Sequence, residues 1–215
     1  QMTIENNSLD YYQEALSVAK ELNDKELISE CFECIGYIFS WIEGKEKDST
    51  DCFLRSLEIR KEINNKSLIA HSYHALGVHY TWSVPKYNKA LEYLTLGLNM
   101  QKEIKGNRGL ARIFLTFGLR YWHTGENEKA LEQLNNAHKI FEELGEKVAV
   151  VETLSWIGLQ HFENNNLNDA LKFVEAAHNV DIELKDFGTR ILSNTVLFLV
   201  RRELGLDNSD KELRL

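Results

Sequence analysis

Small and apolar residues recur along the chain with a period of 40 or 41 residues. Glycine falls in steps of 41, 41 and 40, at Gly36, Gly77, Gly118 and Gly158. A series of small residues and a series of aliphatic residues keep the same period: Ala15, Ser56, Gly97, Ala137 and Ala177, and Leu22, Ile63, Ile104, Leu144 and Leu184. Because independent series share one period, the pattern predicts an array of structural repeats.

Each period predicts two helices joined by a turn. In residues 148–162 apolar side chains stand three and four positions apart, which is the spacing of one helical face. The asparagine-rich turn ENNNLN follows, and the helical spacing resumes from Ala170 to Leu184. Glycine inside a helix costs about 1 kcal/mol relative to alanine. Its recurrence in the first helix therefore predicts a close crossing between the two helices of a repeat.

The repeat boundaries follow from this reading. We expect an all-α fold in which residues 1–215 form a single repeat domain. Partial repeats at both ends indicate a fragment of a longer protein. The expected repeats are 10–24 (partial), 25–65, 66–106, 107–146, 147–185 and 186–215 (partial).

The residues around each glycine resemble the motif of the tetratricopeptide repeat (TPR) family. In the third repeat they are Phe114, Phe117, Gly118, Tyr121, Ala130, Leu134 and Ala137. Ser49 replaces the first alanine in the first repeat, and His161 replaces the tyrosine in the fourth. The period is longer than the usual 34 residues, as in bacterial signalling and transcription regulators and Rap-like peptide receptors. The resemblance implies a right-handed superhelical solenoid of antiparallel helix pairs.

In this family the first helix of each repeat lines a concave, partner-binding groove. The resemblance assigns these groove positions to Tyr37, Trp41, His71, His74, Val78, Trp82, Arg112, Leu115, Leu119, Trp122, His123, Ser155, Leu159 and Phe162. Trp41, Trp82, Trp122 and Phe162 form a predicted aromatic column, and large aromatic side chains are enriched at binding hot spots. The alternative is that these rings pack on the next helix as core.

Composition narrows the classes of partner. Hydrophobic residues make up 43% and charged residues 27% of the chain, so it can bury a core. The net charge of −8 disfavours nucleic acid, which requires a basic surface. Three cysteines and a polar N-terminus indicate a reducing, cytoplasmic location. Apolar runs are too short for membrane insertion.

Motifs for catalysis are not found in the sequence. It has no phosphate-binding glycine loop, no HExxH and no GxSxG, so we expect no enzymatic activity and no cofactor. Cys31 and Cys34 have redox spacing but fall inside a predicted helix. His71 and His74 share a helix face, where a metal site and a pH-sensitive groove are the alternatives to simple groove residues.

These features predict a binding module rather than an enzyme. We expect a scaffold or sensor segment of a signalling or regulatory protein, whose groove takes a protein or peptide with cationic or apolar groups. A peptide-pheromone receptor module is one alternative. A self-association domain is the other, because uncapped repeat ends expose apolar surface.

Overall fold

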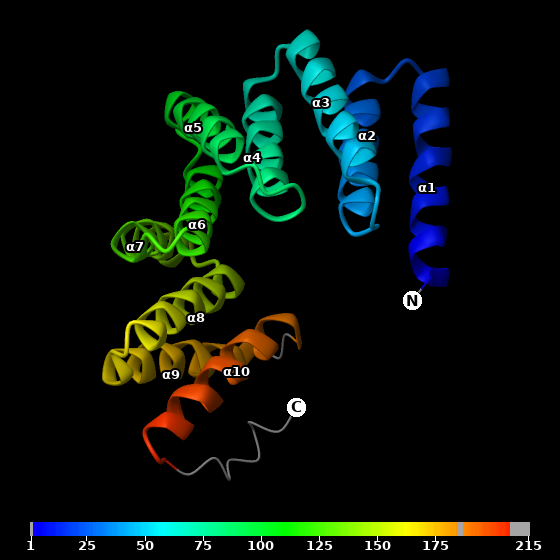
Figure 1. The fold of residues 1–215 in the computed structure, drawn as a ribbon. Helices are drawn as coiled ribbons and strands as arrows, with labels where there is room; N and C mark the ends of the chain where they lie inside the picture. Colours follow the sequence, from blue (N-terminus) through cyan, green and yellow to red (C-terminus); the bar gives the residue numbers. More distant parts are fainter. Residues whose placement is uncertain (1, 185–186, 207–215) are drawn as a thin grey trace. The chain divides into compact units, whose positions relative to one another are not determined.

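The computed structural model describes residues 2–184 and 187–206, and these fold into ten α-helices (Figure 1). The all-α prediction is confirmed, and the helices pack as sequential antiparallel pairs. The helices are α1 (Met2–Glu21), α2 (Lys25–Ser40), α3 (Glu46–Ile63), α4 (Lys66–Trp82), α5 (Tyr87–Ile104), α6 (Asn107–His123), α7 (Asn127–Leu144), α8 (Lys147–Glu163), α9 (Leu167–Leu184) and α10 (Phe187–Glu203).

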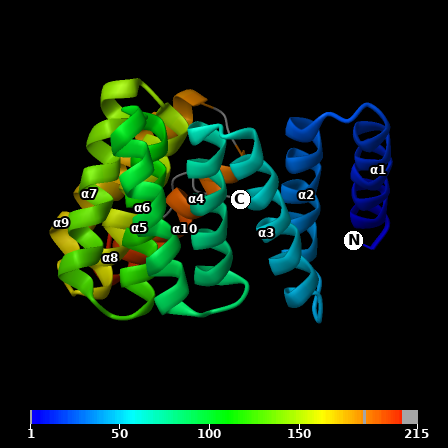
Figure 2. The same ribbon diagram turned by 90° about the horizontal axis from the view of Figure 1, so that it is seen from above.

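The chain divides into two compact units, Gln1–Ile113 and Phe114–Leu215. In the first unit α1 lies against α2, α2 packs on α3, and α4 packs on α5 (Figures 1 and 2). In the second unit α7 packs on α8, α8 packs on α9, and α10 contacts both α8 and α9. The boundary falls inside α6, so the repeat pattern runs through it. The single repeat domain over residues 1–215 stays a prediction.

The periodic glycines lie where the two helices of a pair cross. A Cβ atom added at Gly77 would lie 2.5 Å from Leu94 Cδ2 in the partner helix, and one at Gly158 would lie 2.4 Å from Val174 Cγ1. Real Cβ contacts are longer than this, so only glycine permits the observed approach. The close crossing expected from the sequence is thereby explained.

The turns that follow α1, α3, α5 and α7 end these helices in the same way. Asn23, Asn64, Lys105 and Gly145 occupy one position of the period, and all four have a positive φ, between 53° and 69°. Glycine adopts this left-handed conformation at no steric cost and asparagine tolerates it, which explains three of the four residues. Lys105 adopts it at a cost.

One buried position of the second helix differs in chemistry from repeat to repeat. It carries Arg60 in α3, Gln101 in α5, Phe141 in α7 and Asp181 in α9, and each is at most 8% exposed. We call these four the joint residues, because the polar ones contact a neighbouring pair or the turn leading to it. Gln101 fills the space beside Gly106 in the α5–α6 turn, while Asp181 Oδ2 accepts a hydrogen bond of 3.1 Å from Ser193 of α10.

A buried histidine links α4 to the start of α3. His79 is 2% exposed, and its Nε2 lies 2.8 Å from Thr50 Oγ1. Its Nδ1 lies 3.4 Å from the hydroxyl oxygens of both Ser40 and Ser49. Burial lowers the pKa of His79 to about 4. The imidazole is therefore neutral at physiological pH, and protonating it works against the fold.

Candidate partner-binding face

The exposed aromatic residues of the first compact unit include three on its first helices. Trp41 at the end of α2 is 85% exposed, and Trp82 at the end of α4 is 44% exposed. Tyr37 is exposed one turn before Trp41. These residues, together with His71, His74 and Val78 of α4, define what we call the α2/α4 face. A polar contact also joins these two helices.

That contact is a buried ion pair with a histidine at its outer edge. The guanidinium of Arg60 in α3 donates a hydrogen bond to Glu33 Oε2 in α2, and both side chains are less than a tenth exposed. His71 Nδ1 of α4 lies 3.1 Å from Glu33 Oε1, and its side chain is half-exposed. Two hydroxyls complete the arrangement, because Arg60 also donates to Ser29 Oγ at 3.1 Å and to Ser72 Oγ at 2.9 Å.

Glu33 remains ionised in this setting. Burial by itself would raise the pKa of Glu33, but the hydrogen bond and charge of His71 and the charge and hydrogen bond of Arg60 outweigh it. The pKa of Glu33 is therefore lowered from its usual value. The contacts of Glu33, Arg60, His71 and Ser72 fix α2, α3 and α4 relative to one another.

The other polar groups on the face are neutral at physiological pH. Burial, and then the charge of Glu33, raise the pKa of Tyr37 to about 12. Desolvation, followed by the charges of His71 and Arg112, lowers the pKa of His74 to about 4. Arg112, near the start of α6, is exposed. The face therefore offers exposed aromatic rings and neutral hydrogen-bonding groups, and a compensated ion pair joins the helices that carry it.

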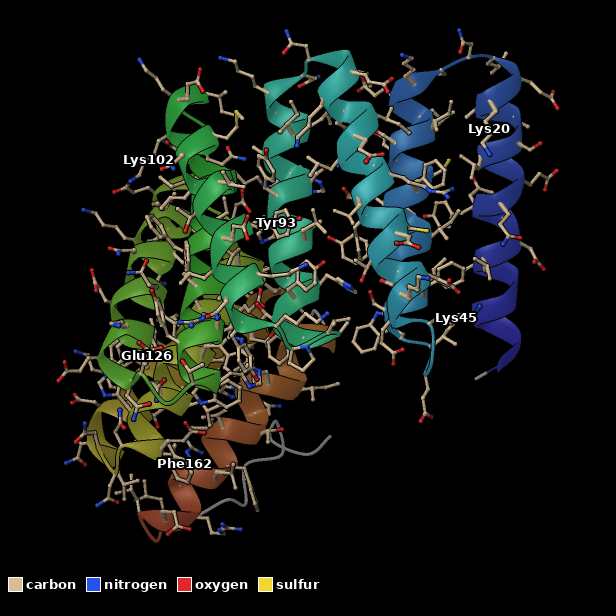
Figure 3. All side chains as sticks on the ribbon, turned by 45° about the horizontal axis from the view of Figure 1, so that its top comes forward. Lys20, Lys45, Tyr93, Lys102, Glu126 and Phe162 are labelled. Carbon is tan, nitrogen blue, oxygen red and sulfur yellow. The ribbon has the colours of Figure 1, made fainter. Side chains whose placement is uncertain are left out.

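Most of the predicted groove residues in the second compact unit are buried or half-buried. Leu115, Leu119 and Ser155 are buried, so these three predicted groove residues lie in the interior. Ser155 Oγ donates to the carbonyl of Val151 at 2.8 Å, within its own helix. Leu159 and Phe162 are half-buried and pack against the Val196, Leu197 and Val200 cluster of α10 (Figure 3).

The predicted aromatic column divides into two registers. Trp41 and Trp82 follow the glycine of their repeat by five positions, whereas Trp122 and Phe162 follow it by four. One residue rotates a side chain by about 100° around a helix. The first two rings consequently point to solvent, while the other two turn toward neighbouring helices and are half-buried.

Trp122 joins two first helices of the second compact unit. Its Nε1 donates to Glu163 Oε2 at 2.6 Å, and its ring centroid lies 5.1 Å from that of Trp156 in α8. His123 is exposed beside it, with ring centroids 4.9 Å apart. Trp156 was not among the predicted groove residues, since it precedes the glycine of its repeat by two positions instead of following it.

Cys31, Cys34 and His71, which the sequence offered as redox or metal-binding residues, have environments typical of structural residues. Burial raises the pKa of the thiols of Cys31 and Cys34, which keeps both protonated and unreactive. Within residues 2–184 and 187–206 no group of three or more His, Cys, Asp or Glu side chains is arranged to hold a metal. His71 is instead engaged by Glu33.

Arg60 is the buried charged residue that the sequence reasoning missed. A signal was present, because the period aligns Arg60 with Gln101, Phe141 and Asp181 on the helix face that packs inward. A charged residue at a buried repeat position calls for a buried partner of opposite charge. Glu33 of α2 is that partner.

Solved structures of TPR-containing proteins share this fold. BtubC (BKLC) from P. vanneervenii superposes with a TM-score of 0.79 at 16% identity, over 94% of this chain and 84% of that one. The apo form of RapI gives a TM-score of 0.74 at 20% identity, over 99% of this chain and 57% of RapI. A Rap protein complexed with Competence and Sporulation Factor gives 0.64 at 15% identity, over 94% of this chain and 60% of that one.

These likenesses establish a TPR-like fold. The chain spans less than two thirds of both Rap proteins. No protein-family model and no curated protein sequence matches this chain. In the part of the chain that the structure describes, no helix is both long and apolar enough to cross a membrane.

Proposed function

We propose that the chain is a TPR-type interaction module that binds a protein or peptide on the α2/α4 face. The observation that carries the proposal is the exposure of Trp41 and Trp82 at the ends of neighbouring first helices. Soluble proteins rarely leave large aromatic side chains in water without a binding role when such residues cluster. The Glu33–Arg60 pair and its hydrogen bond to Ser72 hold together the helices that carry these rings, which lowers the entropy cost of binding.

The chemistry of the face favours an apolar or cationic partner group. Tryptophan rings bind aliphatic surface and, through their π electrons, lysine and arginine side chains. The neutral Tyr37 and His74 provide hydrogen bonds and add no charge of their own to the face. A net charge of −8 on the chain steers a basic partner toward it.

A peptide receptor is the second candidate. It is supported by the likeness to a Rap protein complexed with Competence and Sporulation Factor, which spans 94% of this chain. In this case a short linear peptide suffices for binding, whereas a scaffold requires the folded surface of its partner. Calorimetry with a peptide cut from the captured partner separates the two. A peptide that matches the affinity of the whole partner favours the receptor, and one that binds far more weakly favours the scaffold.

The test begins with affinity capture of the partner from extracts of the source cells, followed by measurement of Kd with the purified partner. We expect Trp41→Ala and Trp82→Ala each to weaken binding tenfold or more, as hot-spot truncations do. Leu96→Ala is the matched control, because Leu96 is also exposed in the first compact unit but lies on α5. An unchanged Kd for both tryptophan variants, with intact circular dichroism, would overturn the proposal.

A further inference from the structure

Two tryptophans and a glutamate come together on the first helices of the second compact unit. Trp122, at the end of α6, and Trp156, in the middle of α8, have ring centroids 5.1 Å apart and planes inclined at 56°. Trp122 Nε1 donates a hydrogen bond of 2.6 Å to Glu163 Oε2 at the end of α8. Both rings are half-buried, and Glu163 is exposed. We call these three residues the α6/α8 site, in which two indole rings meet next to a carboxylate.

The repeat does not require large side chains at the two tryptophan positions. The position of Trp156 carries Cys34, Ala75 and Thr116 in the other repeats, and that of Trp122 carries Ser40 and Thr81 in the first two. Helix pairs with small residues at these positions still form the glycine crossing, as α4 and α5 do. The two tryptophans are thus additions to the common repeat. Large aromatic side chains that packing does not require are typical of a binding surface.

The α6/α8 site carries a negative charge that no basic side chain neutralises. Among the described residues, Glu163 accepts the indole N–H of Trp122 and forms no ion pair. Lys147 is the only lysine or arginine of α8, and it pairs with Glu183 of α9. A hydrogen bond from a neutral indole leaves the charge of the carboxylate in place. The site therefore combines a carboxylate with the electron-rich faces of two indole rings, and both attract a cation.

We propose that the α6/α8 site binds the guanidinium group of an arginine side chain on a partner protein. A guanidinium is a flat cation, so it stacks on an indole face while its N–H groups point outward in its own plane. The carboxylate of Glu163 lies at the edge of the Trp122 ring, where such donors are directed. A lysine ammonium reaches the carboxylate but has no flat face to stack on an indole.

The hydrogen bond from Trp122 prepares the carboxylate for this partner group. A glutamate side chain at a helix end ordinarily loses rotamer freedom when it binds a ligand, which weakens binding. Here the indole N–H already holds Oε2 of Glu163, and Oε1 is left to accept from the guanidinium. Trp156 lies against the Trp122 ring and restricts its movement in turn. The site therefore requires little reordering when arginine binds.

An NMR titration of the purified chain with short peptides tests the inference, because each of the four tryptophans gives its own indole N–H resonance. The probes are the acetylated, amidated tripeptides Gly-Arg-Gly, Gly-Lys-Gly and Gly-citrulline-Gly. Citrulline has the shape of arginine without its charge. We expect the arginine peptide to shift the resonances of Trp122 and Trp156 saturably, with a Kd about tenfold below that of the citrulline peptide. The lysine peptide should bind more weakly than the arginine peptide.

One substitution removes the charge of the site and keeps its shape. Glu163→Gln should weaken binding of the arginine peptide about tenfold, because the amide oxygen still accepts the indole N–H but carries no charge. Glu132→Gln is the matched control, since Glu132 is an exposed glutamate on α7 of the same compact unit. This control removes the same charge from the chain and should leave the Kd unchanged. Far-ultraviolet circular dichroism confirms that both variants are folded.

Three outcomes overturn the inference. One is the absence of a saturable shift at Trp122, or equal affinity for the arginine peptide and either of the other two. Another is an equal loss of affinity in Glu163→Gln and Glu132→Gln, which indicates attraction by net charge alone. The third is a set of shifts confined to Trp41 and Trp82. That result assigns the guanidinium to the α2/α4 face of the first compact unit and leaves the proposed function standing.

Discussion

Replacing Glu33 by glutamine removes the charge that faces the buried guanidinium of Arg60. The substitution keeps the shape of the side chain and changes only its charge and one hydrogen-bonding atom. Arg60 is 2% exposed and would retain the hydroxyls of Ser29 and Ser72, but no carboxylate. Glu33→Gln therefore tests what an uncompensated buried cation costs this fold.

The expected loss follows from the burial of both partners. Breaking a buried ion pair from one side typically costs about 3–5 kcal/mol, because the remaining charge is left desolvated. Replacing both partners by apolar residues is nearly neutral or stabilising. The chain itself carries apolar residues at an equivalent pair of positions, because Leu115 and Phe141 correspond to Glu33 and Arg60 in the repeat. We expect Glu33→Leu combined with Arg60→Met to lie within about 1 kcal/mol of wild type.

Urea unfolding at pH 7, followed by circular dichroism, gives the free energy of unfolding of wild type and of Glu33→Gln. The same measurement is made for Glu33→Leu, for Arg60→Met and for the variant that combines them. The double-mutant cycle then isolates the coupling between the two residues. Glu62→Ala serves as the control, because the Lys25–Glu62 pair is exposed on both sides and such pairs contribute about 0–1 kcal/mol. The reasoning fails if Glu33→Gln costs less than the control, or if the double variant is as unstable as the worse single variant.

Three further predictions concern the core and the turns. Gly158→Ala should destabilise the fold by about 1–3 kcal/mol through overpacking, because the added Cβ would lie 2.4 Å from Val174 Cγ1. Gly36→Ala should be nearly neutral, because the nearest atoms to its added Cβ are 3.3 Å away. Thermal unfolding compares the two variants, and equal losses of stability would contradict the crossing argument. Lys105→Gly should stabilise by about 1 kcal/mol because it relieves a left-handed residue, as a shift in the urea midpoint will show, with Lys102→Gly inside α5 as the opposite control. The pKa of His79 is about 4 in the folded chain and about 6.5 in the unfolded chain, so the unfolded state binds the proton first as the pH falls. The stability that the neutral, buried His79 contributes is therefore fully present above pH 6.5. About 3 kcal/mol of it is lost as the pH falls to 4. Unfolding curves of wild type and His79→Gln at several pH values should therefore differ in slope across this window, and parallel pH profiles would refute it.

The fold was predictable because the period constrains it from several directions at once. Glycine, alanine and aliphatic series all marked the same helix pairs, and the structure places those residues at crossings and in the core. The turns were predictable at Asn64 and Gly145, whose residue types tolerate a positive φ. Lys105 was not, because its side chain gives no such signal and the surrounding turn imposes the conformation.

The candidate site was predictable only in part. Trp41 and Trp82 are exposed, whereas a displacement of one residue turns Trp122 toward α8. The place of these residues in a binding groove stays a prediction. A family motif defines which helix lines a face, and it does not define which neighbours cover each position. Burial of Leu115 depends on those neighbours, so sequence spacing gave no indication of it.

The joint residues have a consequence for how such an array can change over time. A repeat that was simply duplicated or moved would bring Arg60 beside groups meant for Asp181, or leave Gln101 where an aromatic ring is needed to fill space. Each hairpin is therefore matched in size and polarity to one particular neighbour. The contacts of the joint residues thus favour one linear order of the hairpins. We expect that exchanging two hairpins would unfold the chain locally, even though every motif residue remained in place.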